Sequence, residues 1–329
     1  MSQHENVVEN GRAPESDGEA EEVDSDEAHS GSDYDSESYW EPPYSVEELV
    51  EIFLDLYTFL SRLHYEPSGL LIPPQDGWSN ITPEKCAGFG KCHLAIEVMR
   101  RLPYLVTRGA TVDYKSILIN YSNKSPEWFA SFQGEGQHRP GEHVHALDCE
   151  DEEVEDYKIA IAVGWESGGL DLILDLKEGE IIEEMIRYGS SNHNVKQYFT
   201  GLKEKYATLQ LMPCVWRDSF EPSAQGGDAK TAPERDEEKL GKITWDEYVA
   251  SKKVPGARHA SALDVQWLRQ TYRAFGWPGG FRQKEFGAFF EPKMKELERM
   301  EEAGEIEDAW YWMGSNPDYE KCRWEELED

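Results

Sequence analysis

The chain has 329 residues, 39% of them hydrophobic, and its 66 acidic residues outnumber 33 basic residues to give a formal net charge of −33. Such a charge repels phosphate backbones and anionic lipid headgroups, so we expect no direct nucleic-acid ligand, and we expect partner proteins with basic surfaces. The sequence shows no apolar run of about eighteen residues and no secretory leader, which predicts no membrane insertion. We expect a cytoplasmic protein, with the nucleus as the alternative compartment.

Residues 1–40 are rich in Glu, Asp, Ser and Gly and contain few apolar side chains. Because such a segment buries too little surface to offset the entropy of ordering, the sequence predicts a disordered acidic tail. Ser16, Ser30 and Ser32 each precede an acidic residue by three positions, a pattern that suits acidophilic kinases, and phosphorylation would deepen the charge. Chance matches in a Ser-rich acidic tract are the alternative.

Two helices are expected in the first part of the folded region. Ser45 and Glu48 form a capping box ahead of apolar residues at helical spacing, which predicts a helix of about five turns. Thr82 and Pro83 combine a cap with a first-turn proline and predict the start of a second helix, which ends before Pro103.

The β signals come next. Residues 117–121 predict a short strand, and residues 157–187 alternate apolar and polar side chains around a turn at Glu178 and Gly179, which predicts an antiparallel meander. An amphipathic helix is then expected around residues 195–206. Strands followed by helices, without alternating βαβ units, indicate an α+β fold.

The sequence predicts helices in the C-terminal part of the chain. Ser261 is suited to cap a helix that Gly276 closes, and a last helical region near residues 283–303 is expected to be interrupted at Pro292. The expected organisation is a disordered acidic tail (1–40), an α+β domain (41–220), a flexible linker (221–242) and a helical C-terminal extension (243–329).

One loop contains metal-ligating side chains. His138, His143, His145 and Cys149 lie within twelve residues and precede an acidic run. Imidazoles and a thiolate are zinc ligands, so these residues are candidates for a metal site. Their spacing matches none of the common zinc patterns, and surface histidines in a loop are the alternative that we favour.

A phosphate loop is rejected. Gly88, Gly90 and Lys91 precede a helix, but Lys85 stands where the first glycine of a P-loop belongs. Cys92 stands where that motif requires a hydroxyl residue for magnesium. We therefore expect no nucleotide and no other cofactor.

Two further groups lack catalytic geometry. Cys86, Cys92 and His93 suggest a thiol and a base, but adjacent helical side chains do not face each other, so packing explains them better. Asp171 and Asp175 lie four residues apart on one strand, which separates them by about 13 Å, too far for a glycosidase pair. We interpret both aspartates as solvated strand positions.

Trp310, Tyr311 and Trp312 stand together among acidic residues near the C-terminus. Clustered aromatic side chains of this kind anchor protein partners, or they fold back onto the core. The sequence leaves both interpretations open.

The segment GWESGGLDLILDLKEGEI at 164–181, followed by a helix with VKQYFTGLKEKY, resembles the second half of the SUKH superfamily. The blocks LLIPPQDGW, ITPEKCAGFGK, MRRLPYL and YRAFGWPGGFR are similar to those of a filamentous-fungal group. The resemblance implies an α+β fold with a curved sheet packed by helices, used to bind proteins and not to catalyse. The superfamily includes fungal cell-wall-assembly regulators and bacterial immunity proteins, and it offers no catalytic residue to carry over.

The first functional hypothesis is therefore a non-catalytic protein-interaction module, an adaptor in fungal signalling or cell-wall homeostasis. The second is a metal-dependent or small-molecule enzyme that uses the loop from His138 to Cys149. The third is an acidic histone-binding or chaperone-like protein, because acidic tails suit basic clients.

Overall fold

Helices and antiparallel strands together build an α+β fold, as the sequence predicts. The computed structural model describes residues 40–63, 69–105, 111–132, 155–164, 169–185, 189–214, 217–220, 241–253 and 262–306. No helix in these ranges is long and apolar enough to cross a membrane.

The main sheet has six strands in the order β3-β4-β5-β6-β7-β8, with every neighbouring pair antiparallel. The strands are β3 (Thr111–Asp113), β4 (Ser116–Leu118), β5 (Lys158–Gly164), β6 (Leu170–Asp175), β7 (Glu180–Met185) and β8 (Gly189–Asn194).

The meander predicted within residues 157–187 is confirmed as β5, β6 and β7. Gly179 has a φ of +68° in the turn between β6 and β7, and a Cβ there would meet the side chains of Pro43 and Tyr44 at 2.6–2.9 Å. This turn therefore requires glycine for both its conformation and its space. The strand expected at 117–121 is shorter than predicted, and β8 was not predicted at all.

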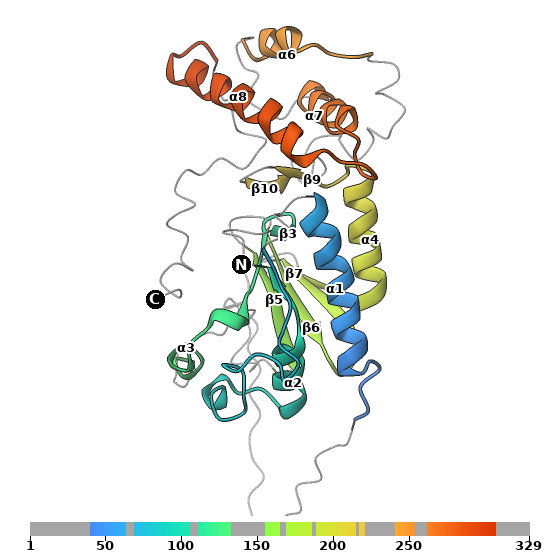
Figure 1. The fold of residues 1–329 in the computed structure, drawn as a ribbon, viewed down its shortest axis with the longest axis vertical. Coiled ribbons are helices and arrows are strands. Elements are labelled where there is room, and N and C mark those ends of the chain that lie inside the picture. The colour runs from blue at the N-terminus through green and yellow to red at the C-terminus, as the bar shows by residue number, and fades with distance from the viewer. Residues whose placement is uncertain are drawn as a thin grey trace, which may run out of the picture. The chain divides into compact units, whose positions relative to one another are not determined.

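Helices α1 (Val46–Leu63) and α4 (Val195–Ala207) lie side by side against the sheet (Figure 1). Both helices begin at a side-chain cap. The predicted capping box is present, with Ser45 N–H donating to Glu48 at 2.8 Å and Glu48 N–H donating to Ser45 Oγ at 3.2 Å. The Asn194 side chain accepts the main-chain N–H groups of Lys196 and Gln197 in the first turn of α4.

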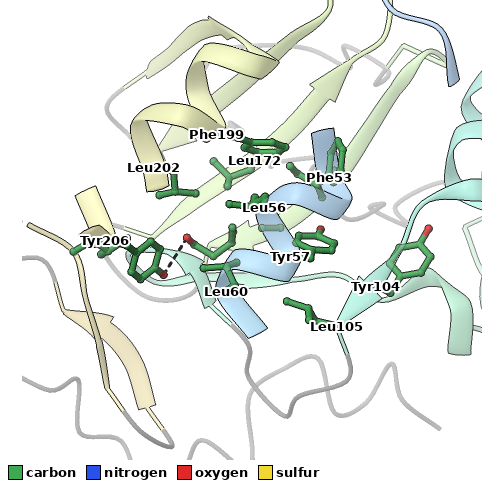
Figure 2. Packing of buried hydrophobic residues seen from close by; sticks show 14 of the residues in the cluster. Phe53, Leu56, Tyr57, Leu60, Tyr104, Leu105, Leu172, Phe199, Leu202 and Tyr206 are labelled. Atoms are coloured by element: carbon green, nitrogen blue, oxygen red, sulfur yellow. Dashed lines mark hydrogen bonds between the residues drawn. The ribbon is translucent and has the colours of Figure 1, made fainter. Parts of the chain in front are cut away.

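The core lies between these helices and the sheet (Figure 2). Phe53 of α1 and Phe199 of α4 meet edge to face with ring centroids 5.0 Å apart, and Leu172 of β6 lies beside them. Burying each of these side chains contributes about 2–3 kcal/mol, so the apolar stripes that predict the helices also explain their packing.

The second predicted helix starts ten residues later than expected. Thr82 Oγ1 accepts the Lys85 N–H at 3.3 Å, as a cap does, but this turn leads only to the short 3-10 helix η2 (Ala87–Phe89), and α2 spans His93–Arg101. Gly90, with a φ of +61°, ends the turn, so the cap at Thr82 serves a turn and not a long helix.

Short elements complete this part of the chain. They are β1 (Leu70–Leu71), β2 (Tyr104–Leu105), η3 (Tyr121–Asn123), α3 (Pro126–Ala130), β9 (Met212–Cys214) and β10 (Arg217–Phe220). β1 pairs with β2, and β9 pairs with β10, in two small antiparallel sheets.

The described residues of the C-terminal region form helices α6 (Trp245–Lys252), α7 (Ala262–Ala274) and α8 (Gln283–Glu302). Contrary to the predicted interruption, α8 continues through Pro292, because buried side chains on both sides of it, among them Phe290 and Met294, hold the helix in place. Trp277 Nε1 donates to the Tyr206 carbonyl at 2.9 Å, which joins this region to the end of α4.

Candidate functional site

Most site residues expected from the sequence lie outside the described residues. These are the candidate metal ligands His138, His143, His145 and Cys149, the aromatic residues Trp310, Tyr311 and Trp312, and the serines Ser16, Ser30 and Ser32. Among the residues that the structure does describe, no group of three or more His, Cys, Asp or Glu side chains is arranged to hold a metal ion.

The thiols near η2 and α2 are packed, as the sequence indicated. Cys86 is fully buried, and this burial raises the pKa of its thiol to about 11. Burial also raises the pKa of Cys92, which stands at the N-terminus of α2. Because the thiolate is the nucleophilic form, neither residue is prepared for catalysis at neutral pH.

The interpretation of Asp171 and Asp175 as solvated positions is wrong. Asp171 is 1% exposed and accepts the Gly164 N–H, while Asp175 accepts the N–H groups of Lys177 and Glu178 at 2.9 and 3.0 Å. The turn after β6 leaves main-chain N–H groups that need an acceptor, and a short carboxylate at the strand end supplies one. Both aspartates thus hold the meander together.

The edge strand β8 differs from every other strand of the main sheet, because five of its six residues are exposed and the sixth is half-buried. It pairs with β7 over its whole length, from Met185 opposite Gly189 to Glu180 opposite Asn194, without a bulge. A Cβ added at Gly189 would meet nothing within 4 Å. β8 is therefore a regular strand, and among the described residues no strand pairs with its outer side.

A main-chain hydrogen bond just beyond β8 establishes which residues of this strand face outward. Val195 N–H donates to the Gly179 carbonyl at 3.1 Å, one step beyond the ladder between β7 and β8. Hydrogen-bonded pairs alternate in an antiparallel ladder, so the odd-numbered residues of β8 bond to β7. The N–H and C=O groups of Ser190 and Asn192 therefore point away from the sheet.

The opposite side of the meander gives the same alternation. Leu176 N–H donates to the Tyr157 carbonyl at 3.3 Å, in the register that pairs Leu174 with Ile159, so even-numbered β6 residues bond to β5. The odd-numbered residues of β6 therefore bond to even-numbered residues of β7. The odd-numbered residues of β7 are then left to bond to odd-numbered residues of β8, which agrees with the first assignment. Within the described ranges, the outward N–H groups of Ser190 and Asn192 have no hydrogen-bond partner.

The side chains of this edge form a polar cluster on the face that packs against α4. One cross-strand row runs from Leu172 to Glu183 and Ser191, and a second from Leu174 to Ile181 and His193. Each row is apolar in the middle of the sheet and polar at β8. We call Glu183, Ser191 and His193 the β8 polar cluster.

The β8 polar cluster has the residue types of a serine hydrolase but not its geometry. Ser191 Oγ lies 3.1 Å from His193 Nε2, and Glu183 Oε2 lies 3.3 Å from the same nitrogen. A catalytic triad requires the serine and the carboxylate on different ring nitrogens, so that one nitrogen takes the proton while the other is held. Here Ser191 also donates directly to Glu183 at 3.1 Å, and the cluster is a shared hydrogen-bond network.

Tyr198 links this cluster to the far edge of the sheet. Its hydroxyl donates to Asp113 of β3 at 3.1 Å, and its ring stacks on His193. Burial, and then the negative charges of Asp113 and Glu183, raise the pKa of Tyr198 well above its ordinary value. Because β3 and β7 are four strands apart in a flat sheet, about 19 Å, one hydroxyl near both carboxylates shows that the sheet curves.

A second surface feature lies on α8. Phe289 is 41% exposed, and with Ile72 it makes up the exposed large hydrophobic side chains within the described part of the chain. Lys293 Nζ lies 4.9 Å from the Phe289 ring centroid and 4.5 Å from that of Trp245. The ammonium group of Lys293 therefore lies close to both rings, at cation–π distance.

Sequence reasoning missed Glu183, Ser191, His193 and Tyr198 as a group. The signal that was available is the six-residue polar stretch Gly189–Asn194 between a completed meander and the asparagine that caps the next helix. No protein-family model, no curated protein and no solved structure matches the chain in the comparisons with known proteins.

Proposed function

We propose that the chain is a protein-interaction module that binds an extended segment of a partner protein as an additional strand beside β8. The observation that supports this is the open side of β8, where the main-chain groups of Ser190 and Asn192 point outward from an exposed and regular strand. Strand addition uses such an edge, because main-chain hydrogen bonds supply affinity without a preformed pocket.

The composition of β8 favours this use. Proteins usually protect an exposed edge with proline, lysine or a bulge, since an open edge pairs with other chains. β8 contains none of these three features. Its short polar side chains and glycine keep it from being a hydrophobic aggregation site while leaving the main chain accessible.

The cellular role follows from the family resemblance. If the resemblance to the SUKH superfamily reflects a shared role, the module acts as an adaptor in fungal signalling or cell-wall homeostasis, and it needs no cofactor. The net charge of −33 speeds encounter with basic partner proteins and makes binding sensitive to salt.

A matched pair of variants tests the proposal. The tagged full chain, Asn192→Pro and Asn192→Ala would each be used for affinity purification from the native cells, with mass spectrometry of the captured proteins. Proline removes the outward N–H and blocks an added strand, whereas alanine keeps it. We expect a partner captured by the wild type and Asn192→Ala and lost with Asn192→Pro.

The unfolding free energy of both variants is measured alongside the purification. Equal capture by a folded Asn192→Pro variant would overturn strand addition at β8. Loss of the partner with both variants would assign the recognition to the asparagine side chain, which also contradicts the proposal.

A further inference from the structure

We infer that the segment received by β8 is basic, with Lys or Arg on the alternate residues that face α4, and that Glu183 receives one of these cations. This inference rests on the proposed function and specifies its partner. It is carried by the charge and the position of Glu183 within the β8 polar cluster.

Within the part of the chain that the structure describes, no lysine or arginine pairs with Glu183. Within the described residues its one ion-pair contact is with His193, and no Lys or Arg lies within salt-bridge distance. Asp113, the other carboxylate beside Tyr198, has Lys205 Nζ at 3.5 Å. The two carboxylates therefore differ, since Asp113 has a described lysine beside it and Glu183 has none among the described residues.

Glu183 also reaches toward the open edge. Its Oε2 lies within hydrogen-bond distance of Ser191 Oγ and His193 Nε2, which belong to β8, and the side chain is 19% exposed while that of His193 is 47% exposed. An added strand would lie about 5 Å beyond β8 and about 10 Å from β7. A long Lys or Arg side chain of the added strand can extend across β8. Its ammonium or guanidinium group then meets the Glu183 carboxylate, which extends toward β8 from β7.

The occupant is another protein and not a second copy of this chain. Two copies would each bring a net charge of −33, and the β8 sequence GSSNHN has no lysine or arginine to offer Glu183 of the other copy. The exposed side chains of β8 include no apolar residue, so no hydrophobic anchor is required of the partner. Main-chain hydrogen bonds and charge complementarity are what the edge provides.

The test uses fluorescein-labelled ten-residue peptides in which Thr alternates with Lys, Gln or Glu, titrated with the full chain at low salt. We expect the Thr-Lys peptide to bind, the Thr-Gln peptide to bind more weakly, and the Thr-Glu peptide not to bind. A Thr-Lys peptide with alternate N-methylated residues should lose binding, because it keeps its charge but not its strand hydrogen bonds.

Two charge-removing variants locate the cation. Glu183→Gln should weaken the Thr-Lys peptide about threefold to fivefold, the value of one solvent-accessible ion pair, and leave the Thr-Gln peptide unchanged. Glu184→Gln is the matched control, because Glu184 is the next residue of β7 and faces the opposite side of the sheet. Its effect should stay below about twofold.

The outcomes separate the two proposals. Failure of every peptide to bind, or undiminished binding of the N-methylated peptide, would overturn strand addition and with it the inference. Binding of the Lys and Gln peptides with equal affinity, or equal effects of Glu183→Gln and Glu184→Gln, would overturn the assignment of Glu183 and leave the proposed function standing.

Discussion

The two edge strands of the six-stranded sheet, β3 and β8, differ in burial and in regularity. β3 has three residues, all buried, and its register with β4 is irregular. The Tyr206 hydroxyl donates to the Val112 carbonyl of β3 at 3.2 Å, the hydrogen bond drawn at Tyr206 in Figure 2. β8 has six residues in regular register, none of them buried, and its outward main-chain groups have no partner among the described residues.

The connection between β8 and α4 explains the difference. α4 begins immediately after β8, at the Asn194 cap, so the helix leaves that edge as it starts. Its side chains Tyr198, Lys205 and Tyr206 all bond to β3, at the other end of the strand order. Because α4 crosses the curved sheet, its side chains cover the edge strand β3. The edge strand β8, from which the helix starts, receives no such cover from α4.

The largest expected effect is on the closed edge. Asp113 is fully buried and accepts hydrogen bonds from the Tyr114 N–H, the Tyr198 hydroxyl and Lys205. Asp113→Ala should lower the unfolding free energy by about 2–4 kcal/mol, because it leaves buried donors without their acceptor. Urea unfolding measures this loss of unfolding free energy, and an unchanged m value shows that the variant unfolds with the same exposure of surface.

The control is Glu183→Ala, which removes a carboxylate next to the open edge and should cost less than about 1 kcal/mol. Equal losses in the two variants would remove the energetic distinction between the edges.

Adjacent proline substitutions in β8 test the direction of its main-chain groups. His193→Pro removes an N–H that bonds to β7 and should cost about 3 kcal/mol, whereas Asn192→Pro removes an outward N–H and should cost about 1 kcal/mol. His193→Ala separates the loss of the imidazole from the effect of proline. If Asn192→Pro were the more damaging of the two in urea unfolding, the assigned alternation would be wrong.

The closed and open regions also differ in how far the sequence predicts them. Apolar residues at helical spacing predict the helix after Ser45 and α4, and apolar residues at alternate positions predict the strands of the meander. β8 has no buried side chain and hence no apolar alternation, so GSSNHN shows only a polar stretch between the meander and the cap of the next helix. Its conformation comes from pairing with β7, which is a long-range effect.

The sequence predictions that the structure contradicts have a related origin. Thr82 is a local cap whose turn is ended by Gly90, and Pro292 is a local breaker that the packing around Phe290 overrides. Asp171 and Asp175 alternate with buried leucines as solvated residues would, yet each accepts main-chain N–H groups. In each case the outcome depends on a hydrogen bond, a turn conformation or a packing contact that the alternation of apolar residues does not report.

The pH dependence of stability tests the residue that connects both edges. Burial and two carboxylates raise the pKa of Tyr198, so the folded state holds the phenol proton more tightly than the unfolded chain. This contribution is fully present below the ordinary pKa of 10.0 and is lost as pH rises above it.

The unfolding free energy of the wild type should therefore fall more steeply than that of Tyr198→Phe between pH 9 and pH 11, by about 1 kcal/mol. The other buried tyrosines are present in both proteins, so their contributions to the pH dependence cancel in the difference. Parallel profiles in urea unfolding would show that burial and the two carboxylates do not raise the pKa of Tyr198 in the folded state.

The smallest expected effects come from removing one hydroxyl at each edge. Tyr206→Phe leaves the buried Val112 carbonyl without its donor and should cost about 1 kcal/mol. Ser190→Ala removes an exposed hydroxyl at the open edge and should change stability by no more than about 0.5 kcal/mol. Both are measured by urea unfolding at neutral pH. A loss at Ser190 as large as that at Tyr206 would mean that the edge has a partner within the chain, and β8 would then not be free to receive another strand.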